Sequence, residues 1–334
     1  MATACRENRY RFKSQTIIGY LALMSDERDR RNTFRILSLD GGGAKGFYTL
    51  GILKQLEAKL GNSPLCEQFD LIFGTSTGAI IATLLALGRR VDEIRELYAN
   101  EVPALMSMRG SNARSAALEA LAARVFDGAT FNDMKTRIGI VTARWLEEKP
   151  MIFKADIGQS HGSKGTFEPG FGASVADAVV ASCSAYPIFN RKRVKTSDGD
   201  VELIDGGYCA NNPTLYAIID ATKALGYGHT DLRVVSLGVG NYPEPPKYWH
   251  RWAIEKFFLV RLLHKTLGIN THSLEQLAML LCADVPMVRV SDSFTTPDMA
   301  ADLMEHNIDK LKLLYRRGLE SFGKYERQLE QLLS

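Results

Sequence analysis

A serine set between glycines is the residue of this chain best placed for nucleophilic chemistry. Ser76 lies in Gly74-Thr-Ser-Thr-Gly78, after the apolar run Phe69–Phe73 and before the apolar run Ala79–Leu87. A strand, a sharp turn and a helix in that order form a nucleophile elbow, because only small residues fit two positions either side of the serine. Free N–H groups at the helix start favour negative charge there. The alternative is a glycine-rich turn that only caps a helix.

A second glycine-rich turn, Asp40-Gly-Gly-Gly-Ala-Lys-Gly46, joins the apolar run Phe34–Leu39 to the helical periodicity of Phe47–Leu60. Its glycine spacing matches the dinucleotide fingerprint, but no acidic residue ends a second strand about 20 residues further on. A Walker loop needs Gly-Lys-Ser/Thr, whereas Lys45 precedes Gly-Phe. The loop is therefore predicted to cradle an oxyanion with its N–H groups. Lys45 either adds positive charge nearby or is simply solvated.

An aspartate at a predicted strand end is the candidate proton acceptor. Asp205 closes the apolar run in Glu202-Leu-Ile-Asp, and Gly206-Gly207 turns the chain away. Catalytic groups gather at the carboxyl ends of strands in open α/β sheets, although an Asp beside glycines is also a common turn former. Cys183 has no evident base in the sequence and is interpreted as a buried structural cysteine.

Composition narrows the class of protein. The chain has 334 residues, 46% of them hydrophobic, and a net charge of +3, which is too small to indicate a nucleic-acid polymer as partner. Its five scattered cysteines contain no Cys-x-x-Cys pair, which argues against a disulfide framework or structural zinc. No apolar run reaches the roughly 18 residues of a membrane-spanning helix. Thr16–Met24 faintly resembles a signal peptide but lacks a cleavage motif, so a cytoplasmic location is expected.

The predicted organisation is one catalytic domain with additions at both ends. Residues 1–33 form an N-terminal extension, 34–240 the catalytic domain, and 241–334 a mainly helical C-terminal extension that packs on the same domain. Residues 103–128 are predicted to be a helical insertion, which either covers a site as a lid or only packs. The remaining expected elements are helices over 89–98, 174–182 and 214–225, strands over 137–143, 151–155 and 232–239, and a hairpin over 191–203.

The C-terminal extension has a composition of its own. Pro243, Pro245 and Pro246 indicate a linker, and residues 248–267 mix Trp and Phe with Arg and Lys. A basic, aromatic, amphipathic stretch can lie at a membrane interface; a helix that merely packs on the domain is the alternative. The spacing of apolar residues over 303–333 predicts a long terminal helix or a helix pair.

The three motifs, in this order and in strand–turn contexts, resemble those of the patatin-like phospholipases over roughly Arg35 to Gly240. Ala181-Ser-Cys-Ser-Ala-Tyr-Pro187 is similar to the small-residue segment before that family's dyad aspartate. The resemblance implies a three-layer α/β/α sandwich with a mainly parallel central sheet and additional terminal helices. It implies Ser76 as nucleophile, Asp205 as general base, and no metal or cofactor. The oxyanion hole is expected at Gly42, Gly43 and Ala44, with support from Gly41, Lys45, Gly46, Gly74, Gly78, Gly206 and Gly207.

Two alternatives stay open, a constitutive Ser–Asp–His α/β-hydrolase esterase and a housekeeping lipase without nucleotide control. A Ser–Asp–His α/β-hydrolase would use Ser76 and Asp205 with His229 or His250, which follow in the right order. Arg35–Leu87 is particularly similar to bacterial patatin-like effectors of antiphage signalling. That similarity implies a cyclic dinucleotide as activator and the phospholipid surface at the inner face of the cell membrane as substrate. A homo-oligomer is left open, and a catalytically silent lipid-binding protein is the least favoured class.

Overall fold

The computed structural model describes residues 33–243 and 254–334, except residue 163. By its contacts the chain divides into Met1–Phe34 and Arg35–Ser334. The first unit lies almost wholly outside the described residues, as do the predicted extension 1–33 and the run Thr16–Met24. His250 and most of the predicted linker lie outside them too.

One mixed sheet of eight strands organises the described residues, in the order β5-β6-β3-β2-β1-β7-β8, with β4 also pairing with β3. β1, β2 and β3 run parallel to one another, as do β7 and β8, while β4 and β6 are antiparallel to β3. The predicted sandwich built on a mainly parallel sheet is confirmed. The strands are β1 (Phe34–Leu39), β2 (Leu71–Thr75), β3 (Arg137–Arg144), β4 (Lys149–Lys154), β5 (Lys192–Thr196), β6 (Gly199–Asp205), β7 (Leu232–Leu237) and β8 (Met287–Val290).

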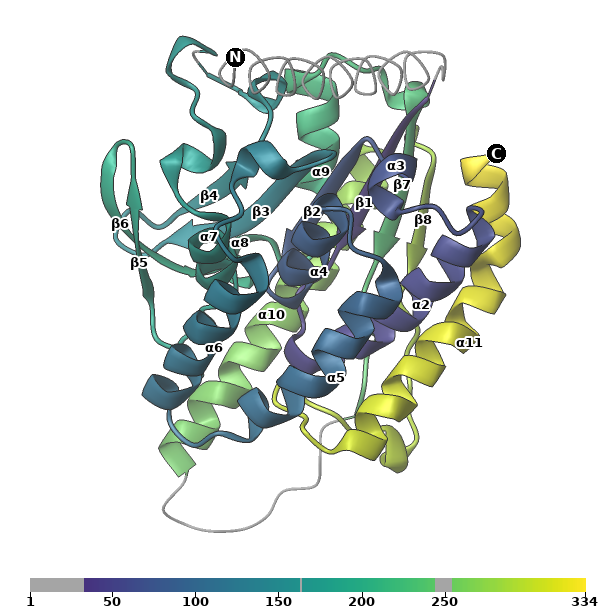
Figure 1. Ribbon diagram of the computed structural model, residues 1–334. Coiled ribbons are helices and arrows are strands. Elements are labelled where there is room, and N and C mark those ends of the chain that lie inside the picture. Colours follow the sequence, from purple (N-terminus) through teal and green to yellow (C-terminus); the bar gives the residue numbers. More distant parts are fainter. Residues whose placement is uncertain (1–32, 163, 244–253) are drawn as a thin grey trace, which may run out of the picture. The chain divides into compact units, whose positions relative to one another are not determined.

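Helices cover both faces of this sheet. In Figure 1, α2, α4, α5 and α11 lie in front of the strands, and α9 and α10 lie behind them. The α-helices are α2 (Gly46–Lys59), α3 (Leu65–Gln68), α4 (Thr77–Ala86), α5 (Val91–Ser107), α6 (Ser111–Phe126), α7 (Val175–Ser182), α8 (Gly207–Ala210), α9 (Thr214–Ile219), α10 (Ile254–Leu281) and α11 (Ile308–Leu333).

The side-chain alternation of β1 shows how the two layers divide. Leu37 and Leu39 are fully buried in the main hydrophobic core together with residues of α2 and α11 such as Leu53. Ser38, between them, points to the opposite face, because successive strand residues alternate. There it accepts a hydrogen bond of 2.9 Å from Thr214 at the start of α9. The face of β1 with Leu37 and Leu39 therefore packs in the hydrophobic core, whereas the face with Ser38 makes a polar contact close to the end of the strand.

The element boundaries differ from the predicted ones at three places. α5 continues through Pro103 to Ser107 instead of ending near Tyr98, and α6 follows as a separate helix. The helix predicted over 214–225 changes from α to π geometry at Asp220, whose buried carboxylate accepts a 2.6 Å hydrogen bond from Lys154. β8 was not predicted, because its four residues are too short to show a period.

Two glycines bring α2 and α11 into close contact. A Cβ built on Gly318 would lie 2.0 Å from the Tyr48 carbonyl oxygen, and one on Gly51 would lie 2.2 Å from that of Tyr315. Both distances are far inside van der Waals contact with backbone atoms that cannot swing away. Gly323, later on α11, has nothing within 4 Å of its Cβ position.

We expect Gly318→Ala to lower the free energy of unfolding by about 1–3 kcal/mol, because the helices must separate to admit the methyl group. Gly323→Ala, the matched control on the same helix, should raise it by about 0.5–1 kcal/mol through helix propensity. Urea denaturation followed by circular dichroism measures both. Equal midpoints for the two variants would contradict the close contact.

Candidate active site

The serine predicted as nucleophile sits in a strained turn between β2 and α4. Ser76 has φ 53° and ψ −124°, a backbone conformation that is costly for a residue with a side chain. A Cβ on Gly74 would lie 2.3 Å from the Gly78 carbonyl oxygen, and one on Gly78 would lie 2.3 Å from that of Leu39. Both flanking positions therefore require glycine, as the elbow pattern predicts.

β6 brings Asp205 to the same point of the sheet from the opposite direction. On β3, Val141 pairs with Thr75 at the end of β2, and the next residue, Thr142, pairs with Asp205 at the end of β6. β4 pairs with both of these β3 residues on the other edge. β2 and β6 therefore share one edge of β3 and end facing each other. Since Ser76 follows Thr75 directly, this register places the hydroxyl and the carboxylate side by side.

The glycines after Asp205 are required by close contacts. A Cβ on Gly206 would lie 2.1 Å from the Val141 carbonyl oxygen, and one on Gly207 would lie 2.7 Å from Cδ2 of Leu267 in α10. The Gly207 N–H donates a 2.7 Å hydrogen bond to the Asp205 carboxylate. The turn therefore holds the Asp205 carboxylate in place and packs closely against α10.

Burial tunes the acid–base character of the pair. Asp205 is 1% exposed, and burial raises its pKa to about 7, although hydrogen bonds from the Gly207 N–H and from Ser76 act to lower it. A carboxylate with such a pKa is a stronger base than an ordinary one. Cys183 is buried as predicted, but it also lies beside the pair. Burial and the nearby Asp205 charge raise the pKa of the Cys183 thiol, and Ser76 hydrogen-bonds to it.

Ser182, at the end of α7, holds the elbow in place. Its hydroxyl accepts a 2.9 Å hydrogen bond from the Ser76 N–H and donates one of 2.6 Å to the Val141 carbonyl oxygen. The elbow is thereby tied to the strand on which β2 and β6 converge. The sequence offered only the small-residue character of this segment as a signal, and no role for Ser182 was predicted.

The glycine loop supplies free backbone donors at the same place. Gly42 and Gly43 line the cavity that contains Ser76, and no acceptor for either N–H is found in the described part of the chain. The Ala44 N–H instead donates to the Leu303 carbonyl oxygen at 3.0 Å. The Ala44 N–H, which was expected to contribute to the oxyanion hole, is therefore already engaged, and the Gly42 and Gly43 N–H groups stay the predicted donors. Lys45 is not solvated either, since it is 8% exposed and burial lowers its pKa to about 8.

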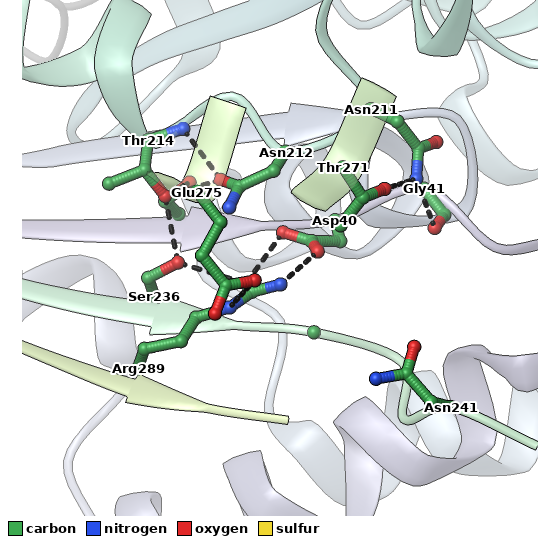
Figure 2. A network of polar contacts seen from close by, with 12 residues as sticks. Asp40, Gly41, Asn211, Asn212, Thr214, Ser236, Asn241, Thr271, Glu275 and Arg289 are labelled. Carbon is green, nitrogen blue, oxygen red and sulfur yellow. Dashed lines mark hydrogen bonds and ion pairs between the residues drawn. The ribbon is translucent and has the colours of Figure 1, made fainter. Parts of the chain in front are cut away.

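A buried ion pair holds the start of the loop (Figure 2). Arg289 of β8 donates hydrogen bonds of 2.9 and 2.6 Å to the two oxygens of Asp40, which is 1% exposed. Burial raises the pKa of Asp40, while the Arg289 guanidinium acts to lower it. Glu275 of α10 lies 3.5 Å from the Arg289 guanidinium, and Ser236 of β7 accepts a further hydrogen bond from it. Asp40 thus connects the loop to β7, β8 and α10.

Asn211 connects the glycine loop to α10 (Figure 2). Its side-chain nitrogen donates to the Gly41 carbonyl oxygen at 3.2 Å and to the Thr271 hydroxyl at 2.7 Å. Its backbone N–H donates to the Asn270 side chain at 2.8 Å, and its carbonyl accepts from the Gly41 N–H. Its side-chain oxygen would meet a Cβ on Gly41 at 2.4 Å and one on Gly207 at 2.8 Å. Sequence reasoning missed these contacts, because their partners come from distant parts of the chain.

A large apolar cavity leads away from the serine. It has an empty volume of about 960 Å³, part of it open to solvent, and both Ser76 and Asp205 line it. The predicted insertion 103–128 contributes to its walls; whether this segment moves as a lid stays a prediction. The apolar walls come chiefly from α5, α6 and α7, with residues such as Leu97, Leu105, Leu118, Leu121, Phe126 and Val179.

His229, one of the two histidines of the triad alternative, is not found at this site. His229 lies outside the cavity lining and hydrogen-bonds through Nδ1 to the exposed Asp284 at 2.9 Å. No histidine lines the cavity in the described residues, and His250 is outside them. Within the same residues no group of three or more His, Cys, Asp or Glu could hold a metal ion, and no helix has the length and apolar character needed to cross a membrane.

Comparison with known proteins identifies the class. The family model described as patatin-like phospholipase matches residues 37–218. The chain therefore belongs to the patatin-like phospholipases and is a lipid-hydrolysing esterase.

Particular relatives refine this assignment. The chain is 58% identical to an Escherichia coli protein named cUMP-AMP-activated phospholipase, over 90% of this chain and 94% of the relative. It is 27% identical to a cGAMP-activated phospholipase of Escherichia coli strain TW11681, over 71% and 73% of the two chains. VipD of Legionella pneumophila, a solved structure, aligns with a TM-score of 0.45 and 13% identity, over 90% of this chain and 67% of VipD.

We expect Arg289→Gln to destabilise the protein by about 3–5 kcal/mol, because it leaves the Asp40 carboxylate buried without a charged partner. The double variant Asp40→Asn/Arg289→Gln removes both charges and should recover part of that loss. Thermal unfolding of both variants beside the wild type measures this. A double variant less stable than Arg289→Gln would contradict the pairing.

Proposed function

We propose that this protein is a phospholipase A-type hydrolase that cleaves acyl esters of membrane phospholipids through a Ser76–Asp205 dyad. The observation that carries the proposal is the convergence of β2 and β6 on adjacent residues of β3, beside the free Gly42 and Gly43 N–H groups. The fold alone would not define a function, since one fold supports many chemistries.

The proposed reaction has two halves. Asp205 accepts the Ser76 proton as the hydroxyl oxygen attacks the ester carbonyl carbon, and the Gly42 and Gly43 N–H groups stabilise the resulting oxyanion. The tetrahedral intermediate expels the lysophospholipid alkoxide, which takes the proton from Asp205. Water then attacks the acyl-enzyme and gives its proton to Asp205. Collapse releases the fatty acid, and Ser76 recovers its proton.

The cavity is the proposed site of the acyl chain. Its walls are apolar, as a hydrocarbon chain requires, and its polar groups gather at one end, around Ser76 and Asp205. An acyl chain that enters between α5, α6 and α7 would present its ester to the hydroxyl. Substrate in this position is proposed to come from the phospholipid surface at the inner face of the cell membrane.

Control by a cyclic dinucleotide is part of the proposal. It rests on the names of the relatives, which are called cUMP-AMP- and cGAMP-activated phospholipases. The constitutive esterase is the alternative. Homo-oligomerisation stays a prediction.

We expect Ser76→Ala and Asp205→Asn each to lower phospholipid hydrolysis by about 10³-fold or more, since each removes one member of a unit. His229→Ala, the control, should stay within about twofold of wild type. Fatty-acid release is measured with no nucleotide, with cUMP-AMP and with cGAMP, and one nucleotide should raise wild-type turnover about tenfold or more. Full activity of the wild type without nucleotide would contradict the proposed control by a cyclic dinucleotide. Activity in Ser76→Ala would contradict the proposed dyad.

The raised pKa of Asp205 sets the pH dependence. A base must be deprotonated, so kcat/KM should fall about tenfold per pH unit below about 7 and level off above it. Initial rates on a soluble ester between pH 5 and 9 measure the profile. An ordinary carboxylate, with a pKa of about 4, would give a flat profile over that range.

A further inference from the structure

The outer face of α10 exposes apolar residues at helical spacing. Leu259, Leu262 and Ile269 are 48%, 51% and 69% exposed. Leu263 and Leu267, on the side of the helix that packs inward, are 4% and 5% exposed. α10 therefore has apolar side chains on both faces, although only one of them packs against the rest of the described chain.

The same half of the helix is basic. From residue 259 to residue 274 it carries Arg261, His264, Lys265 and His272 and no acidic residue. Arg261 and Lys265 are both exposed and lie one turn apart, next to Leu262 on the helix surface. Exposed apolar side chains next to cations on one helix match the boundary between headgroups and acyl chains at the surface of an anionic bilayer.

The inner face of this helix touches the active site. Leu267 lines the cavity together with Ser76 and lies against Gly207 of the Asp205 turn. Asn270 and Thr271 hold Asn211, which holds the glycine loop. A surface in contact with the outer face would therefore be about one helix diameter, roughly 10 Å, from the cavity.

We propose that Leu259, Leu262 and Ile269, with Arg261 and Lys265, form the surface by which the protein docks on an anionic phospholipid bilayer. The inference rests on the proposed function, because a phospholipase must bring its cavity to the membrane. Contact of this face with the same face of a second copy would oppose like charges, whereas headgroup phosphates complement them. The bilayer is therefore the occupant that the charges favour.

Vesicle binding by the full chain tests the proposal, in a Ser76→Ala background so that no lipid is consumed. The test variant is Leu259→Glu/Leu262→Glu. The matched control is Leu277→Glu/Leu280→Glu, which makes the same charge change at residues of α10 that are 41% and 69% exposed but lie beyond the basic half. Co-sedimentation uses vesicles of phosphatidylcholine alone and vesicles that also contain phosphatidylglycerol.

We expect the unmodified surface to bind the phosphatidylglycerol vesicles more tightly, and to lose that preference between about 0.1 and 1 M NaCl. The test variant should bind them about tenfold or more weakly, and the control variant within about twofold. With Ser76 restored, the ratio of turnover on vesicles to turnover on a soluble short-chain ester should fall in the test variant alone.

The outcomes separate the two proposals. Ester hydrolysis absent from the wild type under every nucleotide condition would overturn the proposed function, while vesicle binding would still test the surface. Equal vesicle binding by test and control variants would overturn the docking surface. A lower particle mass for the test variant in light scattering, without lipid, would assign the face to a second copy and overturn it too.

Discussion

The arrangement of this active site depends on the pairing of two strands with one edge of β3. β2 runs parallel to β3 and β6 runs antiparallel to it, and they end against Val141 and Thr142. Because hydrogen-bond register fixes strand ends to within a residue, the serine and the aspartate are positioned by the sheet rather than by flexible loops. The Ser182 hydroxyl donates a hydrogen bond to the Val141 carbonyl oxygen, and Gly206 leaves room for that oxygen because it has no Cβ. Both features help to hold the ends of β2 and β6 together.

The glycine loop also depends on residues that lie outside the part of the chain matched by the family model. The family model ends at residue 218, yet Arg289, Asn270 and Thr271 complete the hydrogen bonding around the glycine loop. The charged part of this network is buried, so it tolerates only one arrangement of its members. The proposed oxyanion donors, Gly42 and Gly43, are thus oriented by elements from both ends of the domain. A change in how α10 packs would reach them through Asn211.

Local sequence patterns predict the turns that hold Ser76, Asp205 and the glycine loop, because each tight turn requires glycines at fixed positions within a few residues. The same reasoning predicted most strands and the sandwich class. It missed Arg289, which pairs with Asp40 across 249 positions, since no local pattern encodes a tertiary contact. It also counted Ala44 among the oxyanion donors and left open whether Lys45 is solvated, because the burial of a side chain and the partner of an N–H group depend on distant contacts, such as the one between the Ala44 N–H and the Leu303 carbonyl oxygen.

The Asn211 amide has a consequence for how this chain can vary. Its side-chain oxygen occupies the volume that a methyl group would need at position 41 and at position 207. Replacing glycine by alanine commonly stabilises proteins by about 0.4–1 kcal/mol where the backbone allows it, but here both positions are closed to it while the amide stays. An alanine at position 41 would require the Asn211 side chain to move, and one at position 207 would require both Asn211 and Leu267 to move, so a substitution in the glycine loop and one at the start of α8 are coupled through a single amide.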